Sequence, residues 1–127
     1  ERWLAWIDDG GLTVISTESR RAVRRVPELV CGEWLSGGRP RRLSFREDGR
    51  VLFVACDRTA ALVRVDRPQR LELQALRQGD AVGWLAVGPD GALEGTDGVL
   101  ALVKRRVNGV MTPAAPGEVG LVARLLE

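Results

Sequence analysis

The residues that could carry out chemistry in this chain are carboxylates, arginines and two cysteines, Cys31 and Cys56. The 127 residues include neither histidine nor tyrosine. Serine–histidine and cysteine–histidine nucleophile pairs, histidine metal ligands and tyrosine bases are therefore excluded. We expect no catalytic residue, no metal site and no cofactor here, so any catalytic activity would reside on other polypeptide.

Carboxylate side chains gather near the predicted turns, at Asp8, Asp9, Glu47, Asp48, Asp90 and Asp97. Paired carboxylates can perform acid–base catalysis or bind calcium. Most of these stand beside glycine, and turns favour aspartate and glycine. We therefore interpret them as turn residues. The alternative is a fragment of an enzyme that uses carboxylates, whose activity would be lost on replacing Asp8, Asp57 or Asp97.

Arginine supplies nearly all the positive charge, because Lys104 is the only lysine among 19 basic residues, against 17 acidic ones. Arginine clusters at 20–25 and 39–42 suggest a nucleic-acid patch, since guanidinium groups bind phosphate in a bidentate geometry. The first cluster lies in a predicted rim strand, where charge discourages edge-to-edge pairing. Aromatic residues that could stack on bases are sparse. An arginine-rich nucleic-acid binder is therefore possible but not favoured.

The two cysteines stand far apart in the sequence, without a C-x-x-C pair. This spacing excludes a four-thiolate zinc site. We predict that both are buried free thiols.

Because no leader of secretory type is evident, we expect a reducing, cytoplasmic compartment. No apolar stretch approaches the roughly 20 residues that span a bilayer, so we predict no membrane partner.

The longest predicted connection, 27–40, is the best candidate for a binding loop, since long loops on rigid frames often carry function. Tryptophan with nearby arginine is typical of an interface anchor. Trp34 could equally cover a seam between two structural units. The predicted interaction residues, in this loop and the next turns, are Glu33, Trp34, Arg39, Arg41, Arg42, Asp57 and Arg58.

The elements that would position these residues repeat along the chain. Residues 3–17 align without a gap with 52–66, apolar against apolar at most positions, and 43–49 align with 85–91, so that two Asp-Gly turns coincide. The repeated pattern is a short strand, an Asp-Gly turn, an apolar strand and two further strands. About four strands in about 40 to 50 residues is the period of a β-propeller blade.

The expected elements follow from alternation and turn residues. Residues 51–56 are apolar on both faces, as in a strand covered on both sides. Trp3, Trp6 and Trp84 are interpreted as core residues, and Asn108-Gly109 is a strong hairpin signal. We predict strands at 3–7, 12–16, 22–26, 42–45, 51–56, 61–66, 71–76, 84–87, 99–107 and 110–112, a weak polar segment at 92–96 and a short helix at 118–126.

The end of the chain carries a family resemblance, in WLAVGPDGALEGTDGVLALVKRRVNG at 84–109 followed by VGLVARLL at 119–126. With these motifs the whole chain resembles the C-terminal part of a bacterial WD-repeat-like β-propeller. Such propellers are often appended to caspase-like peptidase or nucleotide-switch modules. Of the family's Trp-Asp dipeptide only the aspartate has a counterpart, Asp66, and the Gly-His element has none.

The resemblance implies an all-β fold with about three blades of an antiparallel propeller. Residues 1–112 would form this partial propeller, with blades at about 1–30, 41–78 and 82–112, and 113–127 would form a linker and a short helix. Propellers close with about four to eight blades, so this ring is incomplete. The alternative fold is a self-contained β-sandwich or barrel.

An incomplete ring predicts that the remaining blades come from the same gene product, a cleaved chain or identical chains. The first residue, Glu1, and the single methionine, Met111, also lead us to expect a piece of something longer. We therefore expect a non-catalytic protein-interaction or sensor module, a scaffold within a larger bacterial signalling or defence assembly, with a protein partner.

Overall fold

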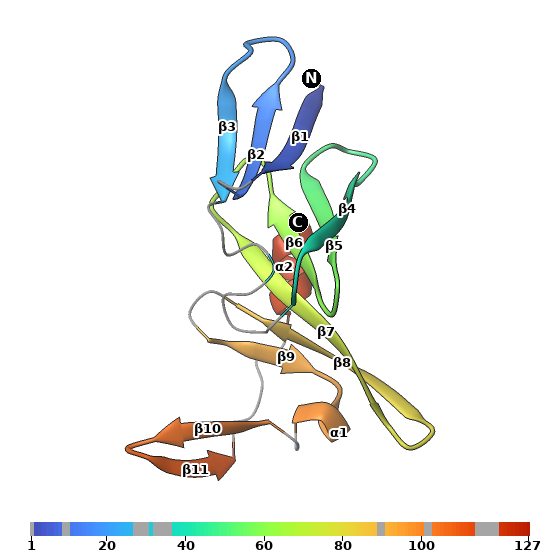
Figure 1. The fold of residues 1–127 in the computed structure, drawn as a ribbon, viewed down its shortest axis with the longest axis vertical. Helices are drawn as coiled ribbons and strands as arrows, with labels where there is room; N and C mark the ends of the chain where they lie inside the picture. The colour runs from blue at the N-terminus through green and yellow to red at the C-terminus, as the bar shows by residue number, and fades with distance from the viewer. Residues whose placement is uncertain are drawn as a thin grey trace.

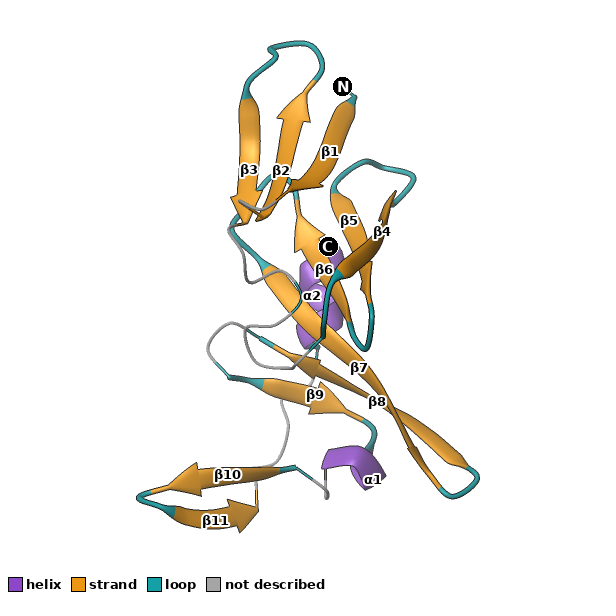
Figure 2. Ribbon diagram, in the orientation of Figure 1, coloured by secondary structure: helices purple, strands orange, loops and turns teal. Residues whose placement is uncertain are grey.

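The computed structural model describes residues 2–8, 11–26, 31, 37–88, 91–100, 103–113 and 120–127 of the chain (Figure 1). Most of these residues lie in short strands, joined by turns (Figure 2). The strands are β1 (Trp3–Asp8), β2 (Gly11–Ser16), β3 (Ala22–Val26), β4 (Pro40–Phe45), β5 (Val51–Cys56), β6 (Ala60–Arg64), β7 (Arg70–Gln78), β8 (Ala81–Val87), β9 (Leu93–Gly95), β10 (Lys104–Val107) and β11 (Val110–Pro113). The helices are α1 (Asp97–Leu100) and α2 (Leu121–Leu126).

The strands form antiparallel sheets with simple topology. One sheet has the order β1-β2-β3 and another the order β4-β5-β6-β7-β8-β9, while β10 and β11 form a hairpin. Within the described ranges neither of the larger sheets closes on itself. The prediction of a mostly β, antiparallel fold is confirmed.

The larger sheet runs through the expected boundary between the second and third blades. β7 and β8 pair along their length, from Glu72↔Val87 to Gln78↔Ala81. Residues 41–78 and the start of 82–112 therefore belong to one continuous sheet. The division into blades stays a prediction.

The β10–β11 hairpin confirms the turn signal at Asn108-Gly109. Both residues have positive φ, 51° and 80°, and Val107 pairs with Val110 across the turn. A two-residue hairpin turn of this kind requires the left-handed backbone that asparagine and glycine adopt most readily. The hairpin lies at the far end of the molecule from β1–β3 (Figure 1).

The predicted strand at 99–107 is wrong in its first half. The N–H groups of Val99 and Leu100 each donate to the Thr96 carbonyl at 3.0 Å, and the chain forms the one-turn helix α1. Val99 is buried against Leu85, in a core cluster of its own. Packing on β8 has thus overridden the β-propensity of this apolar run.

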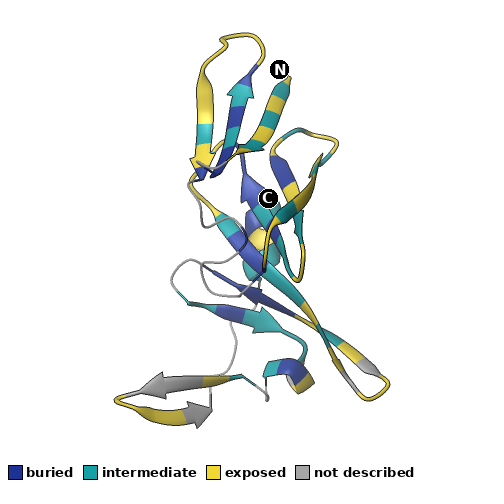
Figure 3. Cartoon of the chain, viewed as in Figure 1, coloured by how far each residue is buried: buried dark blue, intermediate teal, exposed yellow. Residues whose placement is uncertain are grey.

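The main core lies between the two larger sheets, because buried residues of β2, β3, β5 and β6 belong to one cluster. Figure 3 shows the buried positions in dark blue. Strand alternation and cross-strand pairing put β5 residues Leu52 and Val54 on the side facing β1–β3, which we call the inner face of the β4–β9 sheet. The buried residues of this core are Leu12, Val14, Val26, Cys31, Leu52, Val54, Ala61, Val63 and Val65.

The opposite side, the outer face of the β4–β9 sheet, carries helix α2. Val51, Leu71 and Leu125 form a small buried cluster there, joined by half-buried residues of β6 and α2. The predicted terminal helix is therefore confirmed at 121–126, while 118–119 lie outside the described residues.

Two predictions about the sheet faces are wrong. Phe53 is 40% exposed on the outer face, so β5 is covered on that side at Val51 but not along its whole length. Trp6 and Trp84, interpreted as core residues, are 40% and 42% exposed. Trp3 is half-buried and packs against the main core. Phe53, Trp6 and Trp84 are exposed for the same reason. Strand alternation directs their side chains to the outer faces, where little of the described chain covers them.

Candidate interaction site

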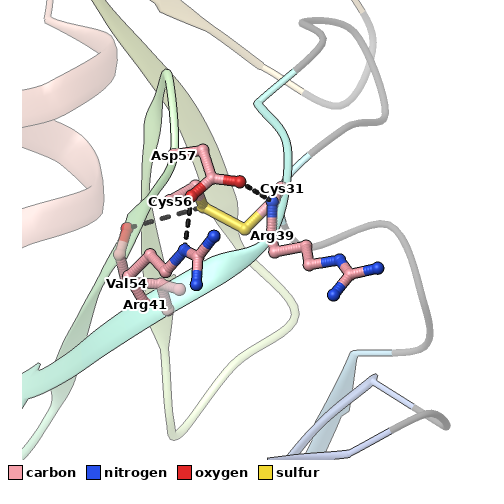
Figure 4. Close-up of a disulfide and its surroundings, with 6 residues drawn as sticks. All are labelled: Cys31, Arg39, Arg41, Val54, Cys56 and Asp57. Carbon is pink, nitrogen blue, oxygen red and sulfur yellow. Dashed lines mark hydrogen bonds and ion pairs between the residues drawn. A yellow bond between two sulfur atoms is a disulfide. The ribbon is translucent and has the colours of Figure 1, made fainter.

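The turn between β5 and β6 is fastened to the segment before β4 by a disulfide and by backbone hydrogen bonds. Cys31 and Cys56 are bonded to each other, with their Cα atoms 6.0 Å apart (Figure 4). The Asp57 N–H donates to the Arg39 carbonyl at 3.0 Å, and the Arg58 N–H donates to the Gly37 carbonyl at 2.9 Å. The turn therefore holds the start of β4 in place.

The prediction of two free thiols is wrong, although Cys31 is buried as expected, at 5% exposure. Sequence spacing could not reveal the bond, because only the fold brings positions 31 and 56 together. Disulfides persist mainly in oxidising compartments, so the bond weighs against the reducing compartment expected from the sequence.

Asp57 organises the predicted arginines around this turn. Its Oδ2 accepts the backbone N–H of Arg39 at 3.0 Å, and its Oδ1 accepts the Nε–H of Arg41 in an ion pair (Figure 4). The hydrogen bond from Arg41, followed by that from the Arg39 backbone, lowers the pKa of the Asp57 carboxyl. The Arg39 side chain leads away from Asp57 (Figure 4), so its guanidinium group is left to face solvent.

Three of the predicted residues line one groove, which we call the arginine groove. Its volume is about 570 Å³, and it lies between β1 and the start of β4. Its walls are Ile7, Asp8, Arg39, Pro40, Arg41, Arg42 and Leu43. The sequence prediction grouped Arg39, Arg41 and Arg42 but missed Ile7 and Asp8, since only the packing of the two sheets brings β1 beside β4.

A second groove, the tryptophan groove, lies on the other side of the β5–β6 turn and has a volume of about 560 Å³. It contains Asp57 and Arg58 together with Trp84, which pairs with Ala75 across β7 and β8. The full lining is Cys56, Asp57, Arg58, Thr59, Ala60, Leu73, Gln74, Ala75, Trp84 and Val122. Sequence reasoning missed Trp84 as a surface residue, because the pairing of Trp84 with Ala75 depends on the register of β7 and β8.

The predicted residues thus divide into three groups. Arg39, Arg41 and Arg42 share the arginine groove, and Asp57 and Arg58 belong to the tryptophan groove. The ion pair between Arg41 and Asp57 connects the two. Glu33 and Trp34 lie outside the described residues, so their predicted role stays a prediction.

Large apolar side chains are exposed on both outer sides of the packed sheets. On the outer side of β1–β3 they are Leu4 at 54%, Trp6 at 40% and Val23 at 41%. On the outer face of the β4–β9 sheet they are Phe53 at 40%, Val82 at 67% and Trp84 at 42%. An antiparallel sheet with one face in water is normally polar on that face. These two sides therefore differ from those of a self-contained sandwich.

Helix α2 is held on the outer face by arginines at its C-terminal end. Arg46 Nη1 donates to the Leu126 carbonyl at 2.8 Å, and Arg64 Nη1 donates to the Leu125 carbonyl at 3.0 Å. Arg67 Nη2 also reaches the Leu125 carbonyl, at 3.4 Å. The last carbonyls of a helix lack hydrogen-bond donors within the helix and carry partial negative charge. These guanidinium groups supply both the hydrogen bonds and the opposite charge.

Two of these arginines are oriented by the same local motif. Arg46 and Arg64 each form a two-point ion pair with the aspartate two positions later, Asp48 and Asp66. The Arg64 side chain is only 2% exposed. The Arg-x-Asp spacing was visible in the sequence, but its role was not, because the helix that it holds is distant in sequence.

The other end of α2 is held by one carboxylate. Glu94 on β9 accepts the backbone N–H groups of Gly120, Leu121 and Val122, the last two at 3.2 and 3.1 Å. A negative charge at the N-terminus and positive charges at the C-terminus both match the helix dipole. We call these contacts to the two ends of α2, made by Glu94, Arg46, Arg64 and Arg67, the α2 clamp. Much of the charge near the helix therefore serves to hold the helix in place.

Two of the carboxylates first considered for catalysis, Asp48 and Asp8, are engaged in local structure. Asp48 accepts the Arg50 N–H at 3.0 Å in the β4–β5 turn, and Asp8 accepts the Trp6 indole N–H at 3.2 Å. Asp9 and Asp90 lie outside the described residues. In the part of the chain that the structure describes, no three side chains of metal-binding type come together.

The first arginine cluster does not form a single surface. Arg20, Arg21 and Arg25 are exposed, whereas Arg24 is partly buried between the sheets. Burial, together with the charge of Arg70, lowers the pKa of Arg24. The cluster therefore gives no continuous phosphate-binding stripe of the kind that the sequence pattern suggested.

Comparison with known proteins gave no match among family models, curated proteins or solved structures. Within the described ranges, neither helix has the length and apolar character that crossing a bilayer demands. The function is therefore argued from the grooves and the exposed faces.

Proposed function

We propose that the chain is a non-catalytic protein-interaction or sensor module, the C-terminal part of a β-propeller in a larger bacterial signalling or defence assembly. The observation that carries this proposal is the exposure of large apolar side chains on both outer sides of the packed sheets, with Trp6 on one side and Trp84 on the other.

The physical argument concerns what these side chains would gain from a partner. Each Å² of apolar surface removed from water contributes about 25 cal/mol, and exposed aromatic residues are the usual centres of protein interfaces. In a propeller both sides of an internal blade are covered by neighbouring blades. The two apolar sides are thus the surfaces on which further blades, from the same gene product, a cleaved chain or identical chains, would pack.

Helix α2 supports the same view, because it covers part of the outer face without closing it. Phe53 and Trp84 stay exposed on the face that carries the helix. Trp84 and Val122 line the tryptophan groove together, so the helix forms one wall of a surface that a polypeptide could occupy.

An arginine-rich nucleic-acid binder is the second candidate, since three arginines share one groove. Two carboxylates count against it. Asp57 pairs with Arg41, and Asp8 lines the same groove. Three positive and two negative charges leave +1, which gives little attraction for a nucleic-acid backbone that carries a charge at every nucleotide.

Selection of a random-peptide display library on the purified chain, followed by affinity measurements, would test the proposal. We expect a convergent set of peptides whose binding weakens about tenfold or more in Trp6→Ser or Trp84→Ser, as for aromatic interface anchors. Val110→Ser is the matched control, because Val110 is 61% exposed but lies on the separate hairpin.

Two results would contradict the proposal. One is the absence of any convergent peptide. The other is binding of a random DNA duplex that weakens steeply as salt rises, which is the signature of phosphate contacts and would favour the second candidate.

A further inference from the structure

The arginine groove lies between two open strand edges. β4 ends the larger sheet and pairs with β5, while β1 ends the smaller sheet and pairs with β2; among the described residues neither has a second neighbour. The two edge strands, β1 and β4, contact each other, so their open edges lie close together (Figure 1). The groove is thus bordered by backbone that can still form hydrogen bonds.

The direction of the free backbone groups follows from the ladder. The Arg46 N–H donates to the Val51 carbonyl at 2.8 Å, toward β5. Because N–H groups alternate in direction along an antiparallel strand, those of Leu43 and Phe45 point to the open edge. Pro40 lacks an N–H, and the register shifts between Pro40 and Arg42, so the usable edge begins after them.

The side chains of the groove combine an apolar floor with positive charge. Ile7 and Leu43 are half-buried and pack against the main core. Arg41 is held by Asp57, whereas the guanidinium groups of Arg39 and Arg42 form no ion pair with another described residue. Two exposed cations beside half-buried apolar side chains in one groove are complementary to a segment in which carboxylates alternate with apolar residues.

We propose that the arginine groove binds an extended acidic segment of a protein partner, which adds a strand to the outer edge of β4. The backbone of the segment pairs with Leu43 and Phe45, its apolar side chains contact Ile7 and Leu43, and its carboxylates pair with Arg39 and Arg42. Open backbone edges select a polypeptide over a nucleic acid. The proposal rests on the proposed function, since it specifies the partner of a protein-interaction module.

Fluorescence anisotropy with three labelled peptides of about ten residues tests the proposal; this length spans a typical strand with some excess. The first alternates valine and glutamate, the second has lysine in place of glutamate, and the third is the acidic peptide with methylated backbone amides. We expect the acidic peptide to bind at least about tenfold more tightly than either of the others, because one lacks the charge and the other the strand pairing.

Variants of the protein localise the binding. Arg39→Glu with Arg42→Glu should weaken the acidic peptide about tenfold and strengthen the lysine peptide. Arg77→Glu is the matched control, since Arg77 is an exposed arginine on β7 away from the groove, and it should leave both affinities unchanged. The milder pair Arg39→Gln and Arg42→Gln, checked by thermal unfolding, separates lost binding from lost folding.

Each contrary outcome has a distinct meaning. Equal binding of the methylated peptide, an equal loss in Arg77→Glu, or competition by random DNA for the same arginines would overturn the proposal. If display-selected peptides that depend on Trp84 bind and the acidic peptide does not, the acidic-strand proposal fails while the proposed function stands. If no peptide of either kind binds, both fail.

Discussion

The inner face of the β4–β9 sheet is buried by apolar packing, whereas the described part of the chain covers the outer face only in part. On the inner face Leu52, Val54 and Val63 are fully buried against the three-stranded sheet. On the outer face a six-residue helix is held at its ends by charged side chains, and Phe53 remains 40% exposed. One side of the sheet is thus closed by apolar packing, whereas the other is covered in part, by a small apolar cluster and by charged contacts to α2.

The difference separates the residues that stabilise the fold from those that we propose for recognition. Apolar burial on the inner face scales with the area removed from water and is the main source of folding free energy. Hydrogen bonds exchanged with water contribute much less net free energy each. We therefore expect the exposed apolar side chains of the outer face to contribute little to folding, which would leave them available to the partner that we propose.

Two adjacent residues of β5 test this separation most directly. Leu52→Ala should lower the free energy of unfolding by about 4 kcal/mol, because Leu52 is 0% exposed and leaves a cavity in the main core. Phe53→Ala, one position away on the outer face, should cost about 1 kcal/mol or less. Urea denaturation measures both, and equal losses would show that the outer face is as important for folding as the inner one.

The sequence predicted the strands and turns of this sheet well, but not which side of each strand is covered. The run 51–56 is apolar at every position, so periodicity alone cannot assign Leu52 to the core and Phe53 to the surface. The same ambiguity placed Trp6 and Trp84 in the core. Cross-strand register and the position of β1–β3 decide these assignments, and both are long-range properties.

The sequence predicted only the part of the candidate site whose residues are close in the chain. Arg39, Arg41 and Arg42 are neighbours in the sequence, so their clustering could be seen there. The wall formed by Ile7 depends on contact between two separate sheets. The bond between Cys31 and Cys56 likewise depends on the fold.

The disulfide gives the second test, because it fastens the inner core to the edge that carries the arginine groove. Cys31 belongs to the main core, and Cys56 ends β5. With a sequence separation of 25, the bond should contribute about 3 kcal/mol, largely by restricting the unfolded chain. The double variant Cys31→Ser and Cys56→Ser should therefore unfold at lower urea concentration than the oxidised protein.

A matched control uses the reducing agent dithiothreitol. It should destabilise the native chain to nearly the same extent and leave the double variant unchanged. An unchanged midpoint for the native chain under complete reduction would show that the bond adds nothing to the stability of the inner face.

The smallest expected effect concerns the α2 clamp on the outer face. The hydrogen bond from Arg46, together with the backbone N–H of Arg50, lowers the pKa of Asp48 from 3.8 to about 2. The folded protein thus holds the ionised form more strongly than the unfolded chain does. This contribution to stability is complete above pH of about 4 and is lost as the pH falls from there through about 2.

NMR titration of the Asp48 carboxyl carbon would measure this directly, with Arg46→Ala as the comparison. We expect a midpoint near 2 in the native chain and a return toward 3.8 in the variant, because the largest cause of the shift is removed. Since Arg46 also donates to the Leu126 carbonyl, the amides of α2 should exchange faster in Arg46→Ala while those of β5 do not change. Faster exchange in both elements would mean that the clamp stabilises the whole sheet, and the two faces would then not be energetically separate.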